Sequence, residues 1–235
     1  MLGRIHENCQ KIGLSIHPGK TKWMKNAHCK TGIIKLNNQI IEEVNSYIYL
    51  GQSLQMNNDI SMEIQRRKQA AWATFNRIKT TITNQQIDIK IRANLCNTQV
   101  LPALTYGCET WNTTQREETA LRTTQRAIER RICNISKTEH IRCTEIRKIS
   151  QIKDVIHSVY ESKRRWAGHI ARQTDDRLTS RVTNWYPRQG KRKPGRPPTR
   201  WEDPLNKIIG KNWRRKAQDR AGWRLYDLHL WRDHR

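Results

Sequence analysis

The sequence predicts a mainly α-helical protein with a small antiparallel β-sheet near its N-terminus, an α+β fold. Short β-branched runs lie within residues 31–54, apolar residues recur with helical spacing from Asp59 to Ile170, and residues 187–200 contain four of the seven prolines. The apolar content of 35% is low, but a chain of 235 residues can still bury one or two modest cores.

The predicted strands lie closest to the N-terminus. Residues 31–44 place two β-branched runs on either side of Asn37-Asn38, a pair that tolerates positive φ and suits a two-residue hairpin turn. We expect a third strand from Tyr47 to Leu54. Little chain precedes these strands to cover the buried face of their sheet, so we expect the end of a larger domain.

Four helices are predicted next. The first has a capping Asp59 and an apolar stripe of Ile60, Ile64, Ala71, Phe75, Ile78 and Ile82. The second buries Ile87, Ile91 and Leu95 and ends before Pro102. The third starts with capping-box spacing at Thr114 and Glu117 and buries Leu121, Thr124, Ile128 and Ile135. The fourth buries Ile152, Ile156, Val159, Trp166 and Ile170, and we expect Arg164 and Arg165 to point outward.

The region after Ile170 is basic and contains many tryptophans. We interpret residues 187–200 as an extended, solvated arm, followed by two short helices with Trp201, Trp213, Trp223 and Trp231. Residues 161–235 have a net charge of +13, against +11 for residues 1–160. The density of positive charge therefore rises toward the C-terminus.

A net charge of +24 indicates a polyanionic partner. Nine tryptophans and six tyrosines favour nucleic acid over a membrane, because aromatic rings stack on bases. The alternative is a helical protein with solvated basic faces. No run approaches the ~20 apolar residues of a membrane span, and the N-terminus has no signal-peptide pattern. We expect an intracellular protein, in the nucleus or the cytoplasm.

The cysteines and acidic residues indicate neither a disulfide framework nor a metal site. The six cysteines are dispersed, which fits a reducing compartment. Cys133, His140 and Cys143 lack the close cysteine pair of a zinc site and are interpreted as packing residues. Asp175-Asp176 is interpreted as part of a loop or a helix cap.

Four segments together resemble a known family. They are GLSIHPGKTKWM (13–24), YIYLGQSL (47–54), RRWAGHIAR (164–172) and GKRKPGRPPTRW (190–201). In this order they are similar to the C-terminal half of non-LTR (LINE-type) retrotransposon endonuclease-reverse transcriptases. The resemblance implies the end of a polymerase palm (1–57), a helical thumb (58–135), a helical connection (136–186), and a basic Pro/Gly arm with a Trp-rich tail (187–235).

The resemblance also implies which chemistry to expect. Polymerases of this family, which synthesise DNA on RNA, hold Mg²⁺ with an Asp-Asp hairpin and an earlier aspartate, and these are absent from the sequence. We therefore expect a catalytically incomplete fragment with no catalytic residue, cofactor or small-molecule substrate. Its expected partner is RNA, DNA or their hybrid. The alternatives are a DNA-binding protein that uses the basic arm, and a non-functional retroelement remnant.

The predicted nucleic-acid contacts each have a structural alternative. Lys20 matches a palm lysine near the departing pyrophosphate, or is a surface lysine. Tyr49, Leu50 and Gly51 match the primer grip, or form an ordinary strand with a bulge. On the first helix, Arg66, Arg67 and Lys68 face a duplex backbone and contribute about −2.7 to the slope of log K against log[salt]. The alternative is that they form a solvated helix face.

The remaining predicted contacts lie in the two C-terminal motifs. Lys191, Arg192, Lys193, Gly195 and Arg196 resemble an AT-hook, whose Gly-Arg-Pro core lies in a narrow minor groove. The alternative for this segment is a flexible linker or a localisation signal. Arg164, Arg165 and Arg200 complete the predicted set.

Overall fold

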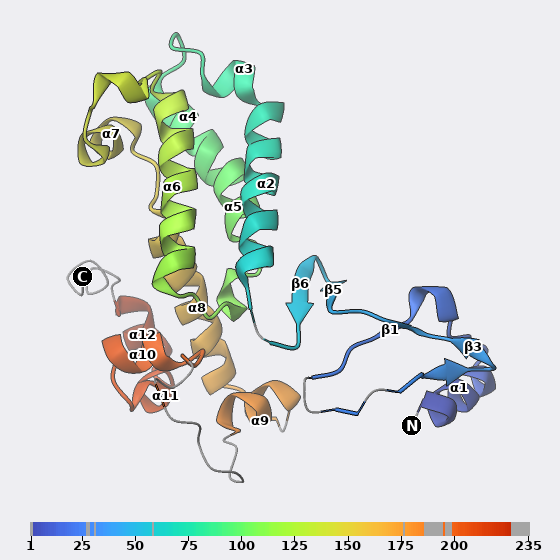
Figure 1. Cartoon of the computed structure of the whole chain (residues 1–235). Coiled ribbons are helices and arrows are strands. Elements are labelled where there is room, and N and C mark those ends of the chain that lie inside the picture. The colour runs from blue at the N-terminus through green and yellow to red at the C-terminus, as the bar shows by residue number, and fades with distance from the viewer. Residues whose placement is uncertain are drawn as a thin grey trace. The chain divides into compact units, whose positions relative to one another are not determined.

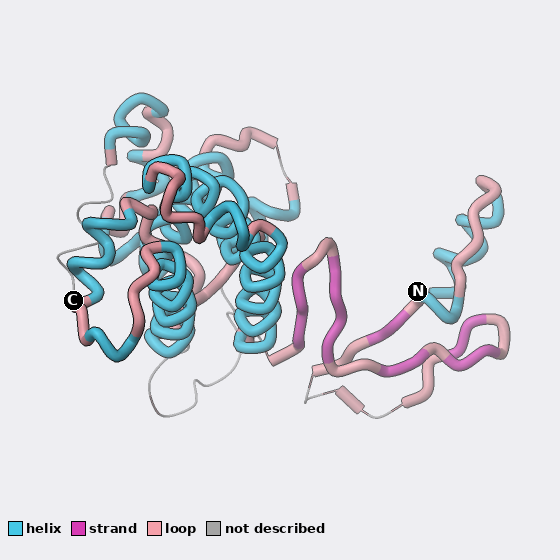
Figure 2. Tube along the Cα trace, turned by 90° about the horizontal axis from the view of Figure 1, so that it is seen from above, coloured by secondary structure: helices cyan, strands magenta, loops and turns pink. Residues whose placement is uncertain are grey.

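The computed structural model describes residues 2–26, 29–30, 32–57, 59–175, 177–185, 195 and 199–226. They form two compact units, Met1–Glu63 and Ile64–Arg235, here called the N-terminal unit and the helical unit. The described strands all lie in the first unit, and most described helices lie in the second (Figures 1 and 2). The predicted mainly α fold with small β elements near the N-terminus is confirmed.

The described residues of the N-terminal unit form one complete α-helix and six short strands. The helix α1 spans Leu2–Lys11, and a 3-10 turn spans Pro18–Lys20. The strands are β1 (Lys22–Trp23), β2 (Lys35–Leu36), β3 (Gln39–Ile40), β4 (Glu42–Glu43), β5 (Ser46–Tyr49) and β6 (Gln52–Gln55). They form three two-stranded sheets, of which β1–β4 is parallel and β2–β3 and β5–β6 are antiparallel. The expectation of one antiparallel sheet is therefore wrong.

Two tight turns determine the local topology. Asn37 and Asn38 have φ of +50° and +63° and connect β2 to β3, as predicted. Leu50 and Gly51 also have positive φ, +48° and +78°, and they connect β5 to β6. The predicted single strand from Tyr47 to Leu54 is therefore a hairpin, because the chain reverses at the pair that contains the glycine.

The core of the N-terminal unit is small. Leu36 and Ile41 are its buried apolar residues among those described. The imidazole of His6 is also buried and lies 2.8 Å from the side-chain amide of Asn37. The buried carboxylate of Glu63 accepts a hydrogen bond of 2.7 Å from the backbone N–H of Ser53.

The helical unit is formed by α2 to α12. The helices are α2 (Ser61–Arg77, which begins in the N-terminal unit), α3 (Lys79–Ile82), α4 (Ile89–Leu95), α5 (Leu101–Thr105), α6 (Gln115–Ile132), α7 (Cys143–Ser150), α8 (Val155–Ala171), α9 (Leu178–Asn184), α10 (Asp203–Ile208), α11 (Trp213–Lys216) and α12 (Arg220–Leu225). Helix α6 packs against α7 and α8, and α5 also contacts α8. In Figure 1, the long helices α2 and α6 of this unit are roughly aligned.

The apolar stripes of the long helices form the first core of the helical unit. The predicted Ile64, Ala71, Phe75 and Ile82 are buried, and so are Leu121, Thr124 and Ile128 on α6. The capping box at Thr114 and Glu117 is confirmed. Ile132 completes the α6 face in place of the predicted Ile135, which follows the end of the helix.

The helix around Pro102 differs from the prediction. A π-helical turn, Cys96–Val100, joins α4 to α5, and Pro102 lies in the first turn of α5. The first turn of a helix tolerates proline, because N–H groups there have no partner within the helix. Ile91, a predicted core residue, is exposed, and Arg92, Ala93 and Cys96 face the interior instead.

The chain beyond the basic segment forms a second core against α8. Ala167 packs with Leu205, Ile209, Trp213, Ala217 and Trp223, which come from α10, α11 and α12 and from the segments that follow them. Where two short helices were expected after residue 200, the described residues form three. No helix in the described part of the chain combines the length and the apolar character needed to cross a membrane.

Candidate nucleic-acid interface

Several cations of the helical unit stabilise the fold. Arg126 pairs with Glu129 at 3.0 Å and with Asp154 at 3.3 Å, and Arg147 pairs with Asp154 at 2.9 Å. Burial raises the pKa of Glu129, because Arg126 offsets the loss of solvent only in part. These cations already have acidic partners, so they are poor candidates for contacts with phosphate.

The three predicted cations of α2 are half-buried. Ile64 and Ala71, which flank Arg66, Arg67 and Lys68 along the helix, face the core. The guanidinium of Arg67 lies 5.0 Å from the ring centre of Tyr106. This cation–π contact holds one of the three side chains against the protein. Arg66 and Lys68 are the neighbouring cations on the same helix.

The Arg-Arg-Trp motif of α8 is oriented differently from the prediction. Arg164 is buried and donates to the backbone carbonyl of Trp223, whose indole N–H donates back to the Arg164 carbonyl at 3.1 Å. Arg165 is exposed, and Trp166 is half-buried, stacked on His169. The expectation that both arginines point outward is thus wrong for Arg164. Its side chain fixes α12, which contains Trp223, to α8.

Lys163 is a buried cation that the sequence analysis did not single out. Its ammonium donates to the backbone carbonyl of Trp111 at 2.9 Å and lies 5.3 Å from the ring centre of Trp201. Burial lowers the pKa of Lys163 to about 8, although the charge of Asp203 acts in the opposite direction. Its spacing of four residues from Val159 and from Ala167 is the signal that could have revealed its burial.

Most of the tail tryptophans are also structural. Trp201, Trp213 and Trp223, here called the tryptophan cluster, have successive ring centres 6.5 and 6.3 Å apart. A Cβ at Gly168 would lie 2.7 Å from Cδ1 of Trp223 and closer still to its Nε1. The glycine of the RRWAGHIAR motif therefore provides the space for this indole. The cluster fills a core, so its rings are not free to stack on bases.

Trp201, the last residue of the second C-terminal motif, contacts α8 at Lys163, just before the first motif. Its indole N–H donates to the backbone carbonyl of Glu109 at 2.7 Å, and Lys163 lies over its ring. Next to it, the backbone N–H of Arg200 donates to the carboxylate of Asp203 at 2.7 Å. Gly195 is exposed with φ of +110°. The other predicted contacts of the hook-like segment lie outside the described residues: Lys191, Arg192, Lys193 and Arg196.

Three of the four predicted contacts of the N-terminal unit, Lys20, Tyr49 and Leu50, are exposed, and Gly51 is half-buried. Lys20 ends the 3-10 turn. Tyr49 and Leu50 lie at the tip of the β5–β6 hairpin, with Gly51 in its turn. Lys20 and the hairpin do not share a strand pair, so the structure presents them as two separate exposed features.

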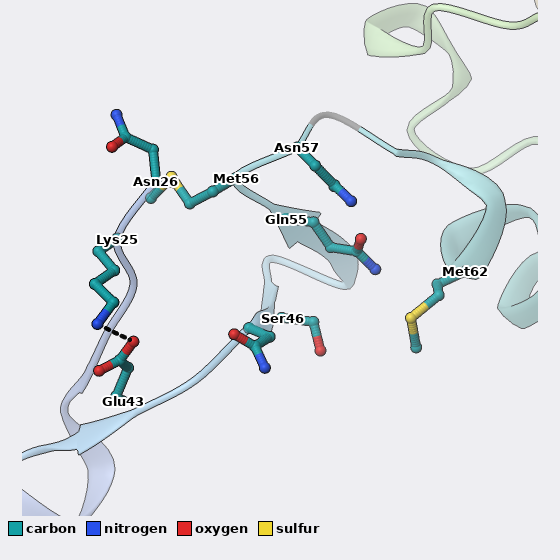
Figure 3. A pocket seen from close by; sticks show the side chains of 9 residues that line it. Lys25, Asn26, Glu43, Ser46, Gln55, Met56, Asn57 and Met62 are labelled. Atoms are coloured by element: carbon teal, nitrogen blue, oxygen red, sulfur yellow. Dashed lines mark ion pairs between the residues drawn. The ribbon is translucent and has the colours of Figure 1, made fainter. Parts of the chain in front are cut away.

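A hollow of about 660 Å³ in the N-terminal unit has a lining rich in amides (Figure 3). The ammonium of Lys25 pairs with Glu43 at 3.1 Å on one side. The other lining residues are Asn26, Asn45, Ser46, Gln55, Met56, Asn57 and Met62. Amide groups both donate and accept hydrogen bonds, so this hollow suits a neutral polar group better than a phosphate.

A second hollow, of about 580 Å³, lies in the helical unit between α6, α8 and α10. The Tyr160 hydroxyl donates to Glu118, and burial together with this carboxylate raises the pKa of Tyr160. Arg122 and Lys207 line the hollow, but so do Glu118 and Asp203. The mixed charge gives no clear preference for a polyanion.

The described residues do not fit a metal. No group of three His, Cys, Asp or Glu side chains gathers within the part of the chain that the structure describes. Cys133 is half-buried, Cys143 is exposed, and both are free thiols. Asp175 pairs with Arg177, and Asp176 lies outside the described residues. No Mg²⁺ or Zn²⁺ ligand is therefore assigned.

The chain is similar to a protein of Caenorhabditis elegans that is named "Putative uncharacterized transposon-derived protein F52C9.6". The two are 37% identical over 240 residues, which cover 95% of this chain and 86% of the relative. No family model matches the chain. No solved structure matches it either.

Proposed function

We propose that the chain is the nucleic-acid-binding C-terminal part of a retrotransposon reverse transcriptase. The chain belongs to the same family as the transposon-derived protein of Caenorhabditis elegans. Its own residues grip a primer-template duplex, largely through the phosphate backbone. The four LINE-like motifs support the type of element. In this proposal the helical unit includes the thumb, and the chain alone adds no nucleotide.

The observation on which the proposal rests is the uneven distribution of charge. The helical unit contains 38 basic and 16 acidic residues, a net charge of +22 out of the total of +24. Buried pairs such as Arg126–Glu129 use some of these cations. A helical unit with this excess attracts a polyanion, most strongly at low ionic strength.

The test targets Arg66 and Lys68 and spares Arg67, because Arg67 packs on Tyr106. The double variant Arg66→Gln/Lys68→Gln is titrated with an RNA–DNA hybrid at several salt concentrations. We expect the slope of log K against log[salt] to become shallower by about 1.8, roughly 0.9 for each lost phosphate contact. An unchanged slope would show that Arg66 and Lys68 do not contact the nucleic acid.

The matched control changes the net charge by the same amount elsewhere in the helical unit. Lys137 and Lys148 are exposed, and Lys148 already pairs with Glu145 at 3.1 Å. Lys137→Gln/Lys148→Gln should leave the salt slope unchanged. An equal change in both double variants would show that net charge, not the α2 site, determines binding.

A second candidate function follows from the Gly195-Arg196-Pro197 segment. A DNA-binding protein that uses this hook-like arm would prefer an A·T-rich duplex with a narrow minor groove. Competition between an A·T-rich DNA duplex and a primer-template hybrid separates the two candidates. Preference for the hybrid supports the polymerase thumb, and preference for the A·T-rich duplex supports the arm.

A further inference from the structure

Helix α9 has an exposed apolar stripe. Leu178, Val182 and Trp185 are 74%, 62% and 68% exposed. Their spacing of four and three residues places them on one face of the helix and its C-terminal cap. Three large apolar side chains exposed along one short face indicate a surface that meets a partner.

Trp185 differs from the other tryptophans of the described chain. Eight of the nine tryptophans lie in the described residues, and among those eight Trp185 alone is exposed. Trp213 and Trp223 fill the core against α8, and Trp166 stacks on His169. Among the described tryptophans, the capacity to stack on bases is therefore concentrated at Trp185.

The charge of the sequence segment that contains the stripe indicates the chemistry of the partner. Residues 177–201 contain eight basic residues and no acidic residue. Arg177, which pairs with the exposed Asp175, precedes the stripe, and Arg181 lies within the helix. An apolar protein partner offers no anionic groups to this excess of basic residues. A nucleic-acid strand offers bases to the apolar side chains and phosphates to the cations.

The helix that presents the stripe is attached to the folded unit. Arg214 of α11 donates to the backbone carbonyl of Thr183 at 3.2 Å and pairs with Glu202 at 3.0 Å. The guanidinium of Arg214 lies 4.8 Å from the ring centre of Trp213, in the tryptophan cluster. The stripe thus has a defined position next to the second core.

From these observations we infer that Leu178, Val182 and Trp185 form a base-stacking surface for an unpaired nucleic-acid strand. The inference deepens the proposed function and rests on it. Bases within a duplex are already stacked on one another, so the indole gains most from an unpaired base. The stripe therefore gives the chain a preference for single-stranded segments, which the phosphate contacts alone do not supply.

The test compares full-length variants on a labelled single-stranded RNA and on a blunt duplex of the same length. Trp185→Ala should weaken binding of the single strand at least about fivefold, since one base–aromatic stack contributes at least that much. Trp185→Phe should restore most of the affinity. The salt slope and duplex binding should not change, because no phosphate contact is lost.

The control variant is Ile91→Ala, which removes an exposed apolar side chain from α4 in the same unit. It should bind the single strand like the wild type. If the wild type binds the single strand and Trp185→Ala binds it equally tightly, the inference is overturned. The proposed function is not affected by that result. The inference is also overturned if Trp185→Ala changes only self-association in sedimentation, which would make the stripe a protein-docking surface. A wild type that binds neither nucleic acid at low salt overturns the proposed function as well.

Discussion

At the scale of single residues, two neighbouring cations of α8 are inside the protein. Lys163 donates to the carbonyl of Trp111, and Arg164 donates to the carbonyl of Trp223. A buried cation is tolerated when such acceptors replace its water. Both side chains thereby tie distant segments to α8. This explains why a basic motif that looks like a binding site from its composition is partly structural.

The lowered pKa of Lys163 predicts a pH-dependent contribution to stability. The pKa falls from its ordinary value of 10.5 to about 8, so between these values the unfolded chain binds more protons at this site than the folded chain. The contribution of Lys163 to the free energy of unfolding therefore rises with pH through that window. We expect the difference in the free energy of unfolding between the wild type and Lys163→Met to grow by roughly 1–3 kcal/mol from about pH 7 to about pH 10.

The measurement is urea denaturation of both proteins across this pH range. Groups that do not interact with Lys163 titrate equally in the two proteins, so the difference between them reports on Lys163 and its charged neighbours. A difference that stays constant or shrinks as the pH rises would show that Lys163 is not held in a desolvated site.

Gly168 gives a second residue-scale prediction. A methyl group there meets the indole of Trp223, so Gly168→Ala should lower the free energy of unfolding by about 1–3 kcal/mol through overpacking. Thermal denaturation followed by near-UV circular dichroism measures the effect. Gly3→Ala is the control, because Gly3 is also in a helix and a Cβ there has nothing within 4 Å. Equal melting temperatures of Gly168→Ala and the wild type would contradict the packing described for Trp223.

At the scale of elements, the start of α6 is determined by its capping box. The carboxylate of Glu117 accepts a 2.7 Å hydrogen bond from the Thr114 backbone N–H, and the helix continues to Ile132. Thr114→Ala should destabilise the chain by about 1 kcal/mol. Thr123→Ala, an exposed change within the same helix, should have little effect. Urea denaturation tests both, and equal stability of the two variants would contradict the role of the cap.

Some elements were predictable from the sequence because their cause is local. The Asn37-Asn38 turn needs two positive φ values, and the capping box needs one hydroxyl and one carboxylate at fixed spacing. The Leu50-Gly51 turn was missed, because a leucine at positive φ gives no sequence signal. The helical path through Pro102 was missed as well, because it depends on a π-helical turn that sequence spacing does not reveal.

The candidate site was less predictable, because exposure depends on tertiary packing. A periodic basic motif does not show that Arg164 turns inward and Arg165 outward, since this depends on where Trp223 docks. In the same way, the sequence alone does not distinguish the exposed Trp185 from the buried Trp213. The clustering of charge toward the C-terminus, in contrast, was readable directly from the composition.

At the scale of the whole molecule, the two units differ in core size. In the N-terminal unit Leu36 and Ile41 are the buried apolar residues among those described, whereas Ile33, Ile48 and Leu50 are exposed. The helical unit buries complete helix faces around α6 and α8. Local stability follows the amount of buried apolar contact, so the N-terminal unit should open more readily.

Hydrogen exchange of the full chain tests this difference in stability. Amides of β5 and β6 should exchange well before those of the central turns of α6, when both are followed by mass spectrometry. Slow exchange in the β5–β6 hairpin, equal to that of α6, would show that the small core is more stable than its burial indicates.

The central claim is that the positive charge of the helical unit binds a nucleic-acid backbone. The most direct measurement is the equilibrium affinity of the full chain for a primer-template RNA–DNA hybrid as the salt concentration rises. We predict tight binding at low ionic strength and a linear fall of log K with log[salt], with a slope of about −0.9 for each phosphate contacted. No binding at low ionic strength, or an affinity that salt does not change, would contradict the claim.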